Sequence, residues 1–306
     1  MIASSYLAGR DRYERAMEGW IDNSHDDAFT HTVRIVDDDA SVELRAVCTP
    51  SPGYEVREAR ARVLAGPPDP SVDDALRDLR GARMVAGFTR RLTELCDGRQ
   101  TAPLLVEAGV EVARLARQAA KLPRSSVAGL AIGDGRACWE LDTTGWIDLP
   151  GSCFTYSDAG RALLNVRPVS SPMVPELYSP SAGAARIFVR RKRARLVLTG
   201  TRLHLFHSMH DNVHGFDVHY ELDLDSQTIV AADSVTSRLP YPGICSEPQA
   251  RIASMIGQPV DASLRKQAQA LLGGGLGCAQ LYDLTADLLR LVSLDFPRLE
   301  RETSAK

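Results

Sequence analysis

A run rich in proline and serine, residues 166–184, places the strongest constraint on how this chain folds. Proline lacks a backbone N–H and fixes φ, so such a run belongs neither in a helix interior nor in a central strand. We therefore expect a linker there, between a first segment (residues 1–165) and a second segment (residues 185–306). At 306 residues the chain is long enough for two domains, each with its own core.

The second segment has the pattern of strands followed by helices. Phe216, Val218, Tyr220 and Leu222 alternate with polar residues, which is typical of an antiparallel strand with one buried face. In the last stretch, leucines recur at helical spacing instead. We predict strands at Arg195–Phe206, His214–Leu224 and Thr228–Val235, and helices at Glu247–Ile256, Asp261–Leu272 and Ala279–Leu294.

The first segment repeats this order of elements. We predict strands at Thr30–Val36, Ser41–Thr49 and Tyr54–Leu64, and helices at Ser71–Arg80, Met84–Cys96 and Ala102–Leu122. Few residues are identical between the two segments, but the shared order predicts an α+β fold of two similar units. Each unit would be an antiparallel sheet plus three helices, related by a pseudo-symmetric tandem duplication. Two unrelated α+β domains are the alternative.

Residues 127–160 lie between the two patterns, and we expect a hairpin and a lid there. Residues 130–141 resemble a hairpin that turns at Gly133-Asp134-Gly135. The stretch from Asp148 to Tyr156 carries polar and reactive side chains, among them Ser152. It is either a surface turn or a lid that reaches the second segment.

Composition and cysteine usage narrow the class of protein. The net charge of −3 provides no global basic field, so we expect no nucleic-acid or membrane partner. The first twenty residues lack the features of a signal peptide, and no run of eighteen apolar residues is present. Six scattered cysteines without a C-x-x-C pair indicate reduced thiols, and we expect a cytoplasmic protein.

Five of the seven histidines fall between residues 204 and 219. Histidine changes charge near neutral pH and is the commonest metal ligand, so this stretch is the first candidate for chemistry. His207 shares a face with Leu203 and Leu205, and His214 lies on the same face as Phe216, so two imidazoles are expected to point to one interior. We take His207, His210 and His214 as candidate general bases, against the alternative of solvated strand residues.

A glycine-rich turn, Gly273 to Cys278, precedes the last predicted helix. Its backbone N–H groups, Gly275 and Gly277 among them, are candidates to bind an oxyanion. A thiol at a helix N-terminus is expected to have a depressed pKa, which makes Cys278 a candidate nucleophile. The alternative is a flexible connection between helices. Cys245, before another predicted helix, is a candidate lining residue or a packing residue.

The second segment resembles a bacterial family known as domain of unknown function 2889, over residues 185–294. The resemblance rests on Val213-His214, Leu222-Asp223, Pro240 to Cys245, and Gly277-Cys278-Ala279-Gln280-Leu281. Family members usually have histidine where this chain has Gln280, so a Cys–His pair is lost here. The first segment would be a degenerate copy, with Ser41, Val72 and Pro103 near the positions of His214, Cys245 and Cys278.

The resemblance implies a catabolic enzyme that cleaves an activated acyl substrate by hydrolysis or retro-Claisen C–C cleavage. An aromatic β-keto acid or its CoA thioester would be the small-molecule substrate. A histidine would activate water, the glycine-rich turn would hold the oxyanion, and Asp148, Ser152, Cys245 and Gln280 would line the site. The alternative is a non-catalytic module that binds a small molecule or scaffolds an enzyme.

Cofactors and assembly are less constrained by the sequence. We expect no bound metal or cofactor, with CoA present only as part of a substrate. A zinc site around His210, His214 and Cys245 is the alternative, and the sequence leaves a homodimer open.

Overall fold

The computed structural model describes residues 4–292 and confirms an α+β fold with antiparallel strands. The described chain forms two compact units. The C-terminal unit comprises residues 4–14, 148–171 and 192–292, and the N-terminal unit comprises residues 15–147 and 172–191. Residues 148–165 therefore belong with the C-terminal unit, whereas the sequence pattern predicted them in the first copy.

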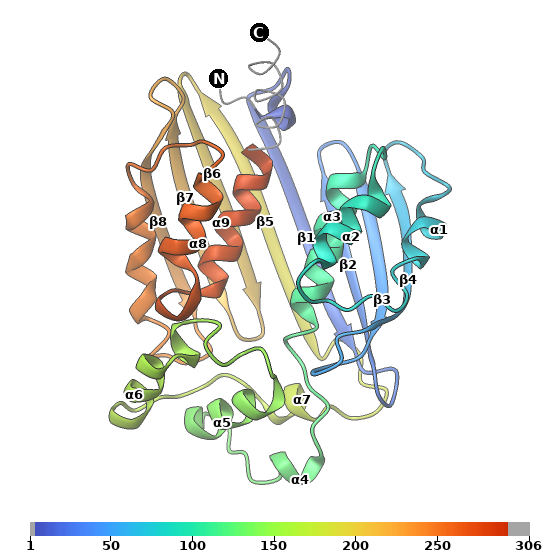
Figure 1. The fold of residues 1–306 in the computed structure, drawn as a ribbon, viewed down its shortest axis with the longest axis vertical. Coiled ribbons are helices and arrows are strands. Elements are labelled where there is room, and N and C mark those ends of the chain that lie inside the picture. Colours follow the sequence, from blue (N-terminus) through green and yellow to red (C-terminus); the bar gives the residue numbers. More distant parts are fainter. Residues whose placement is uncertain (1–3, 293–306) are drawn as a thin grey trace. The chain divides into compact units, whose positions relative to one another are not determined.

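The sheet of the C-terminal unit has the strand order β5-β6-β7-β8. Its strands are β5 (Phe188–Thr199), β6 (Arg202–Asp211), β7 (Gly215–Asp223) and β8 (Thr228–Arg238) (Figure 1). The predicted single strand Arg195–Phe206 is wrong, because the chain reverses between β5 and β6. Gly200 adopts φ +60 at this turn, a left-handed conformation that glycine takes without steric cost.

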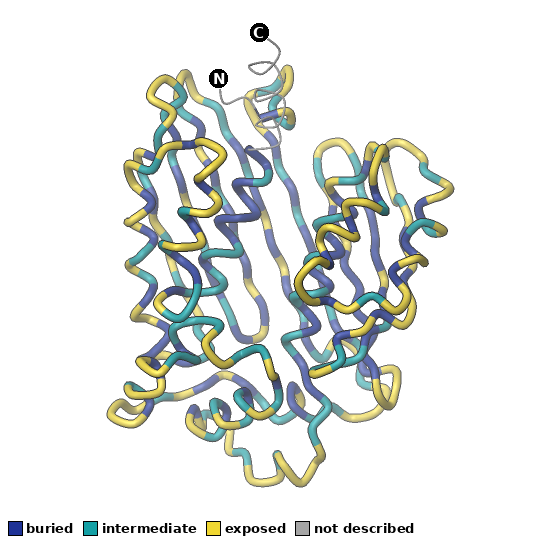
Figure 2. The backbone as a smooth tube through the Cα atoms, in the orientation of Figure 1, coloured by how far each residue is buried: buried dark blue, intermediate teal, exposed yellow. Residues whose placement is uncertain are grey.

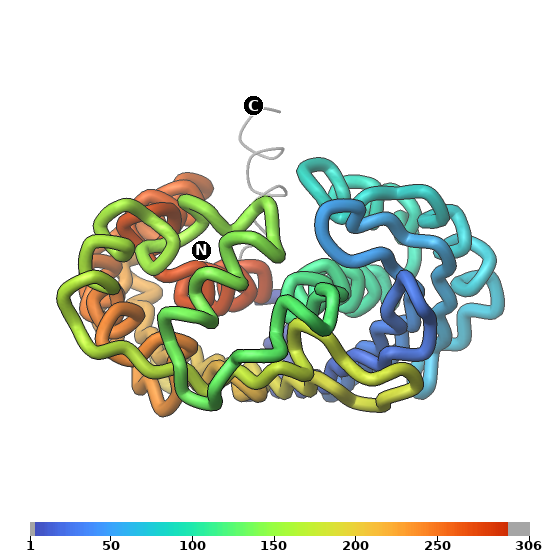
Figure 3. Tube along the Cα trace, turned by 90° about the horizontal axis from the view of Figure 1, so that it is seen from below, coloured from blue at the N-terminus to red at the C-terminus, as the bar shows by residue number. Residues whose placement is uncertain are grey.

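Helical segments cover one face of this sheet, as the view along the strands shows (Figure 3). They are η3 (Glu247–Met255), α8 (Leu264–Leu272), η4 (Gly274–Leu276) and α9 (Ala279–Val292), with the short η1 (Ser5–Leu7), η2 (Phe154–Tyr156) and α6 (Asp158–Val166) completing the unit. The three predicted helices are thus present, although the first is a 3-10 helix. Residues 293 and 294 of the last predicted helix lie outside the described residues.

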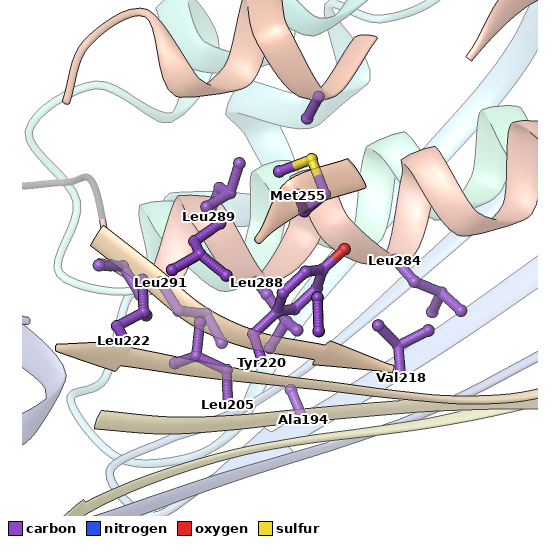
Figure 4. Close-up of a cluster of buried hydrophobic side chains, with 14 of the residues drawn as sticks. Ala194, Leu205, Val218, Tyr220, Leu222, Met255, Leu284, Leu288, Leu289 and Leu291 are labelled. Carbon is purple, nitrogen blue, oxygen red and sulfur yellow. The ribbon is translucent and has the colours of Figure 1, made fainter. Parts of the chain in front are cut away.

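Leucines of α9 pack on alternate residues of the strands to form the core (Figure 4). Leu284 and Leu288, spaced one helical turn apart, are fully buried, as are Val218 and Leu222 on β7. The alternation of buried and exposed residues along the strands is visible in Figure 2. Burial of one strand face against one helix face is therefore what holds the unit together.

The N-terminal unit contains β1 (Arg12–Asp22), β2 (Phe29–Asp37), β3 (Ser41–Cys48) and β4 (Val56–Ala65), paired in sequence order. Its helices are α1 (Val72–Arg77), α2 (Phe88–Cys96), α3 (Ala102–Leu115), α4 (Arg124–Val127), α5 (Gly135–Gly145) and α7 (Pro175–Tyr178). β1 was not among the predicted strands; its buried residues Tyr13, Met17 and Ile21 recur at every fourth position, with Arg15 and Gly19 buried between them. Both units contain four strands followed by helical segments, and a tandem duplication stays a prediction.

The predicted hairpin over residues 130–141 is wrong, because the chain forms α5 there. Asp134 is the N-cap of this helix, and its Oδ1 accepts a hydrogen bond of 2.9 Å from the backbone N–H of Ala137. Asp between glycines is found both in hairpin turns and at helix starts, so the motif alone does not separate the two.

The predicted linker is partly packed in the structure. Met173, Leu177 and Tyr178 are buried, and the Tyr178 hydroxyl donates a 2.8 Å hydrogen bond to Oδ1 of Asp142. No helix within residues 4–292 has both the length and the apolar character needed to cross a membrane.

Candidate functional site

His207 lies on the covered face of the C-terminal sheet, beneath α9. Its Nδ1 is 3.0 Å from the backbone oxygen of Leu284, to which it donates a hydrogen bond, and only 2% of the residue is exposed. The predicted inward orientation, shared with Leu203 and Leu205, is confirmed. The hydrogen bond to the helix backbone fixes the imidazole ring, so His207 is a packing residue between β6 and α9.

His210 and His214 lie at the hairpin between β6 and β7, each beside a different carboxylate. His210 is exposed, and its Nε2 is 3.1 Å from Oδ1 of Asp217. His214 is nearly buried, with Nδ1 3.1 Å from Oδ1 of Asp211. That carboxylate also accepts the backbone N–H groups of Val213 and His214, which closes the turn. The three candidate imidazoles therefore occupy three different environments.

Three backbone N–H groups of the glycine-rich turn donate hydrogen bonds within the chain. The amides of Gly273, Gly277 and Cys278 donate to the backbone oxygens of Gln269, Gly274 and Leu272, at 2.8 to 3.0 Å. A Cβ on Gly277 would lie 1.9 Å from the oxygen of Leu272, so only glycine fits there. These amides close the end of α8, and they are not turned toward a bound oxyanion.

The Asp148–Tyr156 loop reaches this turn, which matches the lid alternative. The backbone N–H of Phe154 donates a 2.8 Å hydrogen bond to the oxygen of Gly277. A Cβ added at Gly275 would lie 3.6 Å from Cβ of Ser157 and 3.9 Å from the backbone oxygen of Gly151, so a side chain there would contact this loop region. Ser152 forms part of a tight turn, because its N–H donates to the oxygen of Leu149.

Three cysteines from separate segments meet where the loop covers the start of α9. We call Cys153, Cys245 and Cys278 the thiol cluster. The hydroxyl of Thr155 lies 2.9 Å from the sulfur of Cys245. The three sulfurs lie close enough that ionisation of one would raise the pKa of a neighbouring thiol. Cys245 and Cys278 were predicted site residues, whereas Cys153, which directly follows the candidate Ser152, was not.

The predicted thiolate at Cys278 is wrong. Burial raises the pKa of this thiol to about 11, although backbone N–H groups of Leu281 and Gln280 at the start of α9 act to lower it. Burial likewise raises the pKa of Cys153 and of Cys245. All three groups are therefore neutral thiols near pH 7. The loss of hydration beneath the loop raises the thiol pKa by more than the N-terminus of α9 lowers it.

The alternative zinc site is not assembled. Within residues 4–292, no group of three or more histidine, cysteine, aspartate or glutamate side chains is arranged to hold a metal ion. His210 and His214 lie beside carboxylates at the hairpin, whereas Cys245 lies with the other thiols.

A second location, on the uncovered face of the same sheet, forms a cavity of about 210 Å³. We call it the outer-face groove, and its polar and aromatic lining comes from all four strands of the unit: Arg195, His204, Phe206, His219, Glu221 and Asp233. Two of the five clustered histidines lie here, and neither was among the candidate bases.

Four of these side chains form a row across the strands. Phe206 is paired with His219, and His219 with Asp233, in the strand register. The guanidinium of Arg195 lies over the ring of Phe206, 5.4 Å from its centroid. The row thus runs from a cation through a phenyl and an imidazole ring to a carboxylate.

The charged ends of the row are available to a ligand. Within residues 4–292, neither Arg195 nor Asp233 has a hydrogen bond or ion pair to another side chain, since the guanidinium only stacks on Phe206 and is electrostatically near Glu14. Glu221, by contrast, is paired with Arg202 at 3.6 Å and with His204 at 3.7 Å.

The groove was recoverable in part from the sequence. Alternation along residues 214–224 placed His219 on the face opposite Phe216 and Val218, which is the face that forms the groove. Arg195 and Phe206 were predicted at the two ends of one strand, which hid the contact between their side chains. Every second residue of a strand points to the same face, and this alternation was the sequence signal for the groove.

No curated protein and no solved structure matches the chain. The predicted resemblance is confirmed for the second half: residues 195–292, which carry the groove, Cys245 and Cys278, match the family described as "Protein of unknown function (DUF2889)".

Proposed function

We propose that the C-terminal unit binds a small planar aromatic acid in the outer-face groove. The observation that carries the proposal is the row of Arg195, Phe206, His219 and Asp233, one residue from each strand. Nothing in this function requires an ionised thiol or a shared histidine interior. The proposal is a specific form of the non-catalytic, small-molecule-binding alternative that the sequence left open.

Each member of the row supports one part of this ligand. An unpaired guanidinium binds a carboxylate through two parallel N–H donors. Phe206 and His219, with ring centroids 4.8 Å apart, offer apolar faces for an aromatic ring. Asp233 at the far end accepts a hydrogen bond from a hydroxyl or amino group. A single substituted ring suits a cavity of about 210 Å³.

The test is calorimetric titration of the purified chain with matched single-ring compounds. We expect 4-hydroxybenzoate to bind more tightly than benzoate, and benzoate more tightly than cyclohexanecarboxylate. Arg195→Gln should weaken 4-hydroxybenzoate binding about tenfold or more, because a charge-assisted hydrogen bond contributes about 1.5–3 kcal/mol. Arg193→Gln, two residues away on the same strand and not part of the lining, is the matched control. Equal affinities for all three compounds, or no effect of Arg195→Gln, would contradict the proposal.

A second candidate is acyl cleavage at Cys278, with an activated acyl compound such as an aryl acyl-CoA as substrate. It is favoured by the position of the sulfur at the start of α9, where it receives two backbone N–H groups under a loop. Displacement of the Asp148–Tyr156 loop would hydrate the thiol and favour the thiolate that cleavage requires. No hydrogen bond joins this thiol to a histidine in the described part of the chain.

The two candidates are separated by turnover. A panel of acyl-CoA esters assayed with wild type, Cys278→Ser and His214→Ala should show CoA release that Cys278→Ser abolishes if acyl cleavage operates. Equal CoA release in all three proteins, or none in any, would rule it out and leave the groove unaffected. We also propose a cytoplasmic location, which six scattered cysteines without a C-x-x-C pair support.

A further inference from the structure

We infer that Cys153 and Cys278 form a reversible disulfide that fastens the Asp148–Tyr156 loop to the start of α9. The inference is independent of ligand binding in the outer-face groove. It assigns a modification site to the thiol cluster, which the proposed binding function does not use.

The backbone brings the two cysteines together. The N–H of Phe154 donates to the oxygen of Gly277 at 2.8 Å, and each cysteine is the direct neighbour of one of these residues. With standard bond lengths, this hydrogen bond limits the Cα atoms of Cys153 and Cys278 to at most about 8 Å apart. Disulfides form at Cα separations of about 4.4–6.8 Å, so a small movement at most is needed.

Solvent exposure distinguishes Cys153 and Cys278 from Cys245, the third member of the thiol cluster. Cys153 and Cys278 are half-buried, whereas Cys245 is buried. A small oxidant entering from solvent therefore meets Cys153 or Cys278 first, and the other half-buried thiol is available to close the bond.

The chemistry needs a two-electron oxidant, and a peroxide is the class we name. One thiol is oxidised to a sulfenic acid with release of water. The second sulfur then forms the S–S bond and displaces a second water, so two thiols and one peroxide yield one disulfide and two waters. A dithiol reductant reverses the reaction. Burial raises the pKa of Cys278 to about 11, so the oxidation accelerates as pH rises.

The experiment treats the full chain with hydrogen peroxide, blocks remaining thiols, and maps tryptic peptides by mass spectrometry without reduction. Trypsin separates the three thiols, since Cys153 lies in residues 137–161, Cys245 in 239–251 and Cys278 in 267–290. We expect a linked pair of the first and third peptides, lost on reduction. Fragment spectra distinguish Cys153 from Cys138, which shares its peptide.

Matched serine variants fix the pairing. Cys153→Ser and Cys278→Ser should each abolish the linked peptide, and Cys245→Ser should retain it. A measurement on wild type alone guards against misfolded variants: amide hydrogen exchange of residues 148–157 should slow after oxidation. A link through Cys245, sulfinic acid without a link, or unchanged exchange would overturn the inference.

Discussion

The phenyl ring of Phe206 lies against the imidazole of His219 on the uncovered face of the C-terminal sheet, with centroids 4.8 Å apart and planes inclined by 53°. The two residues are directly paired between β6 and β7, so the contact is set by strand register. In an isolated sheet such a pair stabilises two strands. Between the unpaired Arg195 and Asp233, it also forms the floor of a cavity.

Replacing Phe206 with leucine should lower affinity for an aromatic acid while sparing an aliphatic one. Leucine keeps most of the apolar surface but removes the ring face, which contributes about 0.5–1.5 kcal/mol, or roughly twofold to twelvefold in affinity. Titration of Phe206→Leu with benzoate and cyclohexanecarboxylate measures this difference. His210→Ala, on β6 but outside the groove, is the control, and equal losses for both compounds would contradict the role of the ring.

Lys192 and Asp287 form a buried ion pair, and replacing Asp287 should destabilise the fold more than replacing Lys192. Nζ and Oδ2 are 3.3 Å apart, both side chains are only 5% exposed, and Asp287 is also paired with Arg290. Asp287→Asn removes the charged partner of the buried Lys192 ammonium at 3.3 Å and should lower the free energy of unfolding by about 3 kcal/mol or more. Lys192→Met leaves Asp287 with Arg290 and should cost less. Urea unfolding of both variants tests this, and equal losses would argue against it.

The Cys278 thiol should make the protein less stable at alkaline pH. Burial raises its pKa from 9.0 to about 11, so between these values the unfolded chain has lost a proton that the folded chain retains. The stability that the protonated thiol contributes is fully present below pH 9 and is lost as pH rises toward 11. Under reducing conditions, the free energy of unfolding of wild type should therefore fall more steeply over this range than that of Cys278→Ser. Parallel pH profiles would show that the thiol is not protected by burial.

The N-cap of α5 should contribute measurably to stability. Removing the Asp134 carboxylate leaves the N–H of Ala137 without its acceptor, and loss of such a cap costs about 1 kcal/mol. Thermal unfolding should show a lower midpoint for Asp134→Ala and a midpoint near wild type for Asp134→Asn. Glu140→Ala, exposed on the same helix, is the control. A midpoint for Asp134→Ala that equals this control would indicate that the cap is not formed.

Local patterns predicted much of the fold. The alternation around Phe216 and Val218 identified both faces of β7, because burial against α9 selects apolar residues at every second position. The missed β1 shows the limit of this argument. Its inward residues include Arg15, a charged side chain that is 4% exposed and paired with Asp37 and Glu107, so its hydropathy does not reveal its position.

The candidate site was less predictable, because it depends on contacts between distant segments. Cys153, Cys245 and Cys278 meet only after the chain folds, and no sequence spacing relates them. The Cys278 thiol stays protonated because a loop more than one hundred residues earlier in the chain covers it. The position of Cys278 at the start of a helix does not reveal this loop. Likewise, the pairing of Arg195 with Phe206 requires the turn at Gly200.

Histidine-selective NMR during titration with 4-hydroxybenzoate tests the central claim most directly. The imidazole resonances of His204 and His219, assigned with His→Gln variants, report on the groove. His31, which is 1% exposed in the N-terminal unit, serves as an internal reference. The account predicts saturable shifts of His204 and His219 in wild type that are lost in Arg195→Gln, with His31 unchanged. Shifts confined to other histidines, or none at saturating ligand, would contradict it.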